Sequence, residues 1–73
     1  MQRVTIACRV LPDRRGRPRV AYLTGWSFGA DKPGWTYDHT RADILRGTEQ
    51  DARLWLDALR RDGIQAMTMT EEG

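Results

Sequence analysis

The sequence predicts a small two-layer α+β domain, an antiparallel sheet of three or four strands with one helix packed on one face, in the order β-β-β-α-β. Three segments within the first 39 residues alternate apolar and polar side chains with a period of two, which is typical of strands. A later segment, residues 49–62, repeats its apolar residues at helical spacing. Because 73 residues suffice for only a small core, we expect a single domain over residues 1–73.

The first two strands, residues 3–11 and 19–28, form a predicted hairpin. Their even-numbered positions are mostly apolar or aromatic, and we expect this even-numbered row to face the helix. Pro12 and Pro18 cannot donate hydrogen bonds to a ladder, so they mark where pairing stops. Gly16 lies between them and can adopt the positive φ that a tight turn requires.

The remaining elements follow from turn and capping signals. Pro33-Gly34 predicts a second turn, after which residues 35–39 alternate as a short third strand. Thr48 is a favoured N-cap residue, and Gly63 is a favoured residue at a helix C-cap. Residues 64–70 are predicted to be a fourth strand. The apolar residues at helical spacing, which we expect to face the core, are Ala52, Trp55, Leu56 and Leu59.

Positive charge is concentrated in the hairpin, where Arg14, Arg15, Arg17 and Arg19 lie within six positions. Residues 1–20 contain six arginines and one acid, a net charge of +5, whereas residues 21–73 contain six basic and nine acidic residues, a net charge of −3. One end of the fold is therefore basic. Arginine is suited to bidentate contact with phosphate or carboxylate, so we expect this hairpin to meet an anionic partner.

Three tryptophans are many for a chain of this length. Trp55 lies on the predicted core-facing stripe, whereas Trp26 and Trp35 flank the second turn, where a tryptophan either packs in the core or anchors a partner. Lys32 gives that turn a polar rim. The predicted partner-binding residues are Arg14, Arg15, Arg17, Arg19, Trp26, Lys32 and Trp35.

Catalysis and cofactor binding find little support in the sequence. The chain has one serine, one histidine and one cysteine, and no nucleophile elbow surrounds Ser27, although His39 can approach it across neighbouring strands. Cys8 alternates with apolar residues and is expected to be buried. No pair of cysteines, second histidine or glycine-rich phosphate loop is present. We therefore expect no enzyme activity, no metal and no cofactor.

We expect a non-enzymatic binding protein that docks on a partner protein or ribonucleoprotein complex with an acidic surface, through the arginine hairpin and the tryptophan-containing loop. The acidic balance of residues 21–73 favours this reading, because strong nucleic-acid binders are usually basic overall. The alternative is direct binding of DNA or RNA by the basic two-stranded ribbon, which fits a major groove. As an edge strand, residues 64–70 can also pair with a second copy.

A sheet with a basic first hairpin, RRGRPR, followed by a helix that starts TEQDA, resembles the arm-type DNA-binding domains of phage-type tyrosine recombinases over residues 3–62. The fourth strand and the acidic C-terminal half depart from that pattern. In size and style the chain is also similar to small phage and mobile-element proteins that dock on host complexes, including inhibitors of defence nucleases. These resemblances imply a binding function.

The composition also bears on localisation. A single cysteine permits no internal disulfide, which is typical of a reducing cytoplasm. The apolar N-terminal segment is interrupted by Arg9, so no signal peptide is expected. No apolar run approaches the ~20 residues that cross a bilayer. We therefore expect a cytoplasmic protein that does not bind membranes.

Overall fold

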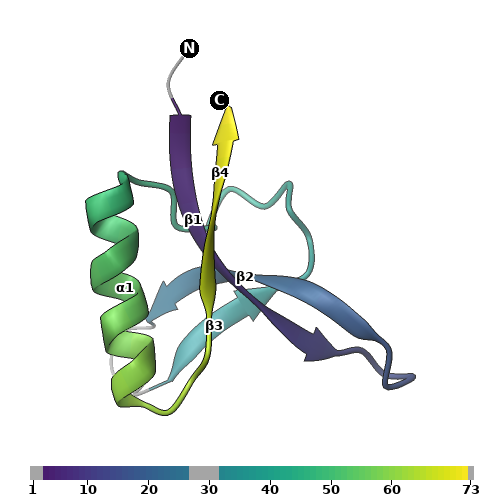
Figure 1. Ribbon diagram of the computed structural model, residues 1–73. Coiled ribbons are helices and arrows are strands. Elements are labelled where there is room, and N and C mark those ends of the chain that lie inside the picture. The colour runs from purple at the N-terminus through teal and green to yellow at the C-terminus, as the bar shows by residue number, and fades with distance from the viewer. Residues whose placement is uncertain (1–2, 27–31, 73) are drawn as a thin grey trace.

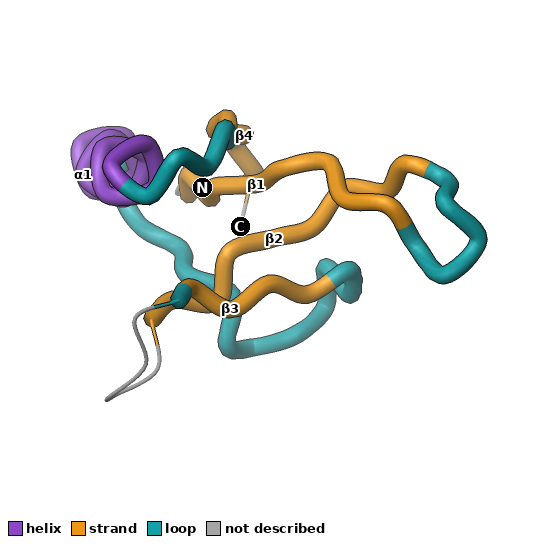
Figure 2. The backbone as a smooth tube through the Cα atoms, turned by 90° about the horizontal axis from the view of Figure 1, so that it is seen from below, coloured by secondary structure: helices purple, strands orange, loops and turns teal. Residues whose placement is uncertain are grey.

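The computed structural model describes residues 3–26 and 32–72 and confirms the α+β fold class (Figure 1). Its elements are β1 (Arg3–Pro12), β2 (Pro18–Trp26), β3 (Pro33–Thr36), α1 (Glu49–Arg61) and β4 (Met67–Glu72). The strands form one antiparallel sheet in the order β3-β2-β1-β4, with α1 on one side of it (Figure 2). The first half of β1 pairs with β4 and its second half pairs with β2.

The predicted third strand, residues 35–39, is misplaced, because β3 runs from Pro33 to Thr36. Pro33 and Gly34, predicted as a turn, pair instead with Trp26 and Gly25 of β2. Asp38 causes this early end by turning the chain. Its Oδ1 accepts hydrogen bonds from the backbone N–H of Thr40 at 3.0 Å and from the Thr40 hydroxyl at 2.6 Å. The same two hydrogen bonds, the side-chain one first, lower the pKa of Asp38 below its ordinary value.

The other predicted boundaries differ by a few residues. β4 starts at Met67 rather than at residue 64, because Ile64 donates its backbone N–H to the carbonyl of Leu59 at 2.9 Å in the helix C-cap. α1 ends at Arg61 rather than at residue 62. Of the predicted second strand, residues 27 and 28 lie outside the described residues.

The expectation that the even-numbered row faces the helix is wrong. The core cluster on the helix side joins Ala7 of β1 and Leu23 of β2 to Leu59 of α1, so odd-numbered positions meet the helix. The physical reason is size and shape. Ala7 is completely buried and has a short side chain, which lets the helix approach the sheet closely. The even-numbered row lies on the opposite face, where Ile6 and Cys8 are still buried.

The connector between β3 and α1 closes the sheet where β1 and β2 separate. Thr5 and Gly47 exchange two backbone hydrogen bonds, at 2.8 and 3.1 Å, and Leu45 donates to the carbonyl of Leu23 at 2.9 Å. Ile44 of the same connector is buried. This segment therefore supplies core residues as well as a link to the helix.

The caps of α1 agree with the sequence signals. Thr48 and Asp51 form a reciprocal capping box, in which each side chain accepts a hydrogen bond from the other residue's backbone at 3.1 Å. Gly63 adopts φ +76°, the left-handed conformation expected at the end of the helix.

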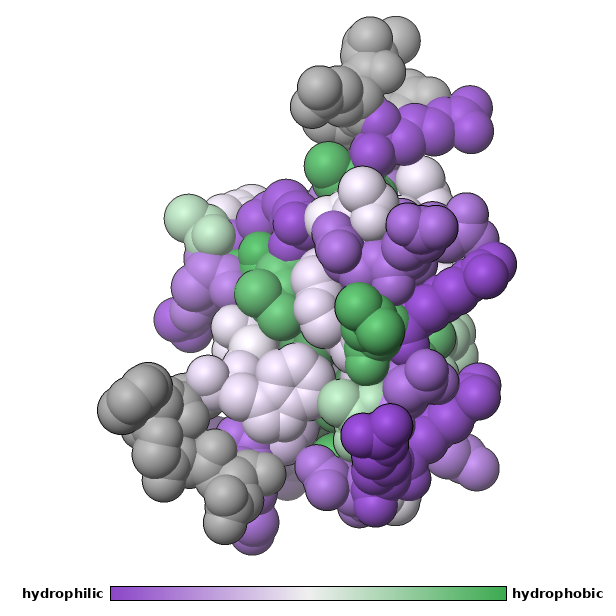
Figure 3. All heavy atoms as spheres, turned by 90° about the vertical axis from the view of Figure 1, so that its left-hand side faces the viewer, coloured by the Kyte–Doolittle hydropathy of each residue, from purple (hydrophilic) through white to green (hydrophobic). Residues whose placement is uncertain are grey.

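Seen from the side that carries α1, apolar side chains gather near the centre of the molecule and hydrophilic ones surround them (Figure 3).

Two further observations concern the core and the membrane. Cys8 is buried as predicted, and burial raises the pKa of its thiol, which keeps the thiol protonated at neutral pH. Among the described residues, α1 is the only helix, and its 13 residues are too few and too polar for a membrane span.

Candidate functional site

The arginine-rich turn is shaped by Asp13. Its Oδ1 accepts hydrogen bonds from the backbone N–H groups of Arg15 at 2.8 Å and Arg17 at 2.9 Å. Its own backbone N–H donates to the carbonyl of Arg17, and Gly16 adopts φ +78° to close the turn. The one acid among these arginines is thus bonded to backbone amides, which holds the turn in one conformation.

This role of Asp13 leads to a prediction about stability. Asp13→Ala is expected to lower the free energy of unfolding by about 1 kcal/mol, because two backbone donors lose their side-chain acceptor. Asp13→Asn keeps an acceptor oxygen and should retain most of this stability, although it removes the same negative charge as Asp13→Ala. Urea denaturation followed by circular dichroism measures both. Equal losses for the two variants would assign the effect to charge instead of hydrogen bonding.

A first hollow lies beside the turn, on the helix-facing side of the sheet. Tyr37 forms one wall, and its hydroxyl donates a hydrogen bond to the carbonyl of Pro12 at 3.0 Å. The Arg19 guanidinium lies over the Tyr37 ring, 4.7 Å from its centroid, in a cation–π contact. The residues that line this first hollow are Pro12, Asp13, Arg14, Arg15, Arg19 and Tyr37.

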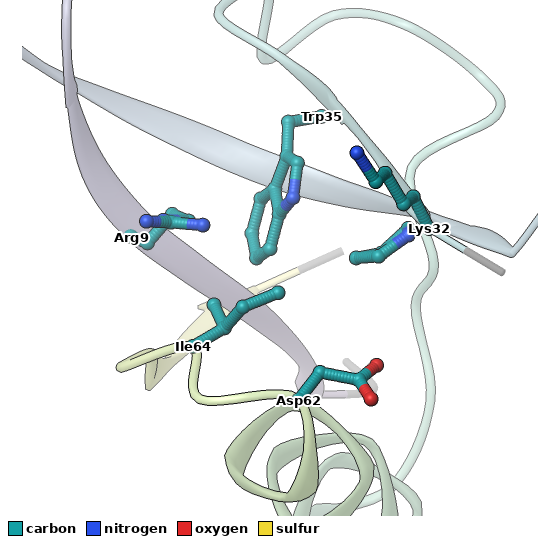
Figure 4. A pocket seen from close by; sticks show the side chains of 6 residues that line it. Arg9, Lys32, Trp35, Asp62 and Ile64 are labelled. Carbon is teal, nitrogen blue, oxygen red and sulfur yellow. The ribbon is translucent and has the colours of Figure 1, made fainter.

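A second hollow lies between the sheet and the C-terminal end of α1 (Figure 4). The Trp35 ring extends toward Ile64, with the Arg9 guanidinium on one side of it and Lys32 on the other. The Arg9 guanidinium carbon lies 5.4 Å from the Trp35 ring centroid. Asp62 approaches from the helix end. The residues that line this second hollow are Arg9, Lys32, Pro33, Trp35, Asp62 and Ile64.

Arg9 carries an unusual polar atom. Its Nε is buried and has no hydrogen-bond partner, although the side chain as a whole is only half-buried. A buried donor without a partner costs about 1–3 kcal/mol. Proteins rarely keep such a group.

The sheet register places the two hollows side by side. Arg9 pairs with Ala21 and Leu11 with Arg19, while Leu23 pairs with Trp35, so their side chains project from one face. Arg9 lies opposite Ala21, two positions along β2 from Arg19, so the two cation–aromatic pairs are about 7 Å apart along the strand. We call the cationic and aromatic residues of the two hollows the basic surface. Its members are Arg9, Arg14, Arg15, Arg19, Lys32, Trp35 and Tyr37.

Five of the seven predicted partner-binding residues therefore line the two hollows. Arg17 is exposed at the turn but lines neither of them. Trp26 is 37% exposed at the far end of β2 from the turn, and it is also outside both hollows. Trp55 packs against the core cluster, as its position on the helix suggested.

The sequence analysis missed Arg9 and Tyr37. Arg9 and Arg19 both occupy odd-numbered positions of the first two strands, which the predicted orientation turned away from the helix. With the opposite orientation, the same alternation places both arginines on the helix side of the sheet. Tyr37 was assigned to the third strand, but only its contact with the hairpin shows its place in the site.

The ion pairs in the described part of the chain lie away from the basic surface. Arg41 pairs with Asp43 at 2.6 Å in the connector, and Arg53 pairs with Glu49 at 3.4 Å on the helix. Both pairs are largely exposed. The cations of the basic surface therefore have no carboxylate within ion-pair distance among residues 3–26 and 32–72.

Metal binding and nucleophilic catalysis find little support among the described residues. They contain no group of three or more histidine, cysteine, aspartate or glutamate side chains placed to hold a metal ion. Ser27, which the sequence suggested as a candidate nucleophile beside His39, lies outside the described residues.

The chain was also compared with known proteins. No protein-family model, curated protein or solved structure matches it.

Proposed function

We propose that this protein is a non-catalytic module that binds the phosphate backbone of a nucleic acid with its basic surface. The observation that carries the proposal is the set of five cationic side chains that line the two hollows, none of them in an ion pair among the described residues. Arg9 and Arg19 are held over aromatic rings, which limits their rotamers before a ligand arrives.

The spacing of the two hollows favours a polymer over a small anion. About 7 Å along β2 separates their cation–aromatic pairs. Along one strand of a duplex, one nucleotide step is about 3.4 Å, so the two pairs are about two steps apart. A single phosphate would occupy one hollow and leave the other empty. A nucleic-acid backbone would reach both.

An acidic partner protein or ribonucleoprotein complex is the second candidate, and one observation favours it. Trp26 is exposed beside the second turn, and an exposed tryptophan is a frequent anchor of protein interfaces. A small inhibitor that docks on a nuclease would use such an anchor together with the arginine hairpin. Trp26 lies outside both hollows, so the basic surface does not need it.

The test is fluorescence anisotropy with labelled duplex and single-stranded DNA and RNA, at low and at near-physiological salt. Five phosphate contacts predict that log affinity falls with log salt at a slope of roughly −4.5 on duplex DNA. The triple variant Arg14/Arg15/Arg19→Ala should reduce the magnitude of this slope by roughly 2.7. The matched control is Arg41/Arg53/Arg61→Ala, which loses the same net charge away from the basic surface.

The control variant decides between a site and a general charge effect. Equal losses in both triple variants would mean that net charge alone attracts the nucleic acid. If the folded wild-type protein binds no nucleic acid at low salt, the proposal is wrong. A pull-down with wild type and Trp26→Ala would then test the protein partner.

A further inference from the structure

The free edge of β4 is the second surface with a specific chemistry. β4 ends the sheet, and no strand borders its other side in the described part of the chain (Figure 2). Residues 67–70 contain no proline and no charge, the usual features that protect an edge from pairing. Met67 is 58% exposed and Met69 is 36% exposed. We propose that β4 pairs antiparallel with β4 of a second copy, which joins two sheets into one of eight strands.

The backbone of β4 presents its free groups in a regular pattern. Thr5 bonds through both its N–H and its carbonyl to Gly47, on the side of β1 away from β4. In an antiparallel ladder the bonding direction alternates, so the even-numbered residues of β1 bond to β4. The backbone N–H and carbonyl groups of their partners Met67 and Met69 therefore point toward β1. The backbone N–H and carbonyl groups of Thr68 and Thr70 point to the free edge.

Side-chain matching selects one register for the pair. With the two-fold axis at Thr68, Thr68 pairs with its own copy, and Thr70 pairs with Ala66. Met67 then lies opposite Met69 of the other copy, and Glu71 lies opposite Gln65. With the axis at Met69, Glu71 would lie opposite Met67, and with the axis at Thr70 it would lie opposite Met69. Only the first of these registers joins the exposed methionines to each other and keeps the glutamate beside a polar side chain.

The sheet face that carries the methionines supports a second copy as the occupant. On this open face, opposite α1, the exposed apolar residues Met67 and Met69 continue into Val10 and Val20. Because the proposed axis is perpendicular to the sheet, the open faces of both copies lie on the same side. Residues 67–70 of both copies are uncharged, so the two β4 strands meet without like-charge repulsion. Met67 and Met69 of both copies, four methionines in all, come together across the new strand pair. The buried core of one chain is small, which makes this additional apolar contact valuable.

Sedimentation equilibrium over a range of concentrations tests the association. We expect the mass to rise from 8.4 kDa toward twice that value as concentration increases. M67K/M69K places lysines opposite lysines in the proposed register and should give a monomer at every concentration. M67K/M69E places each introduced lysine opposite an introduced glutamate and should restore the dimer. Circular dichroism shows whether each variant is folded. A wild-type protein that remains monomeric throughout would overturn the proposal.

Cross-linking tests the register independently. In a Cys8→Ala background, Thr68→Cys places two thiols at a hydrogen-bonded pair with Cα atoms about 5.5 Å apart, which a disulfide can bridge. Thr70→Cys is the matched control, because its two copies would be about 13 Å apart along the strand. Oxidation should cross-link the first variant and leave the second monomeric on a non-reducing gel. Preferential cross-linking of the Thr70→Cys variant would show that the register is wrong.

Discussion

Leu59→Ala is expected to lower the free energy of unfolding by about 2–5 kcal/mol. Leu59 is completely buried and joins α1 to Ala7 of β1 and Leu23 of β2 in the core cluster. Its neighbour Ala7 is small and cannot expand into the cavity that the substitution would leave. A domain of this size has a total stability near the lower end of the usual range of about 5–15 kcal/mol, so this loss removes a large part of it.

Thermal and urea denaturation followed by circular dichroism measure this effect. Leu54→Ala is the matched control, because it makes the same chemical change on the same helix at a side chain that is 67% exposed. We expect the control to change the free energy of unfolding by less than about 0.5 kcal/mol. Similar losses for both variants would contradict the assignment of Leu59 as the main contact between the helix and the sheet.

Arg9→Met is expected to change binding and stability in opposite directions. Affinity for duplex DNA should fall, and the salt slope should become less steep by roughly 0.9, because one phosphate contact is lost. Stability should rise by about 1 kcal/mol, because the buried unpartnered Nε disappears while an apolar chain still covers Trp35. The lost cation–π contact, worth about 0.5–1 kcal/mol, offsets only part of this gain.

Arg19→Met provides the comparison for this experiment. Arg19 has the same kind of contact, over Tyr37, but it has no buried unpartnered nitrogen. Its replacement should weaken binding by a similar amount and lower stability by about 0.5 kcal/mol. Anisotropy titrations and urea denaturation on both variants give the four values. If Arg9→Met lowered stability as well, the Nε would have a partner in solution, such as water, and the predicted gain in stability would be wrong.

Local signals in the sequence were enough to locate most of the elements. The alternation in the first two strands, the turn around Gly16 and the capping residues Thr48 and Gly63 each depend on neighbours along the chain, and the structure places each of them close to where it was expected. The arginine-rich turn was also evident, because it needs only sequence proximity. These features determined the β-β-β-α-β order and the hairpin part of the site.

The tertiary structure decided which face of the sheet meets the helix and which residues join the hairpin arginines. Alternation states which side chains share a face, but both faces of this sheet have apolar centres, so close packing of the helix over Ala7 made the choice. The pairing of β2 with β1 and β3 then brought Arg9 to Trp35 and Arg19 to Tyr37. Contacts between residues so distant in the chain depend on strand register, and register is set by the packing of the whole sheet and not by any local pattern.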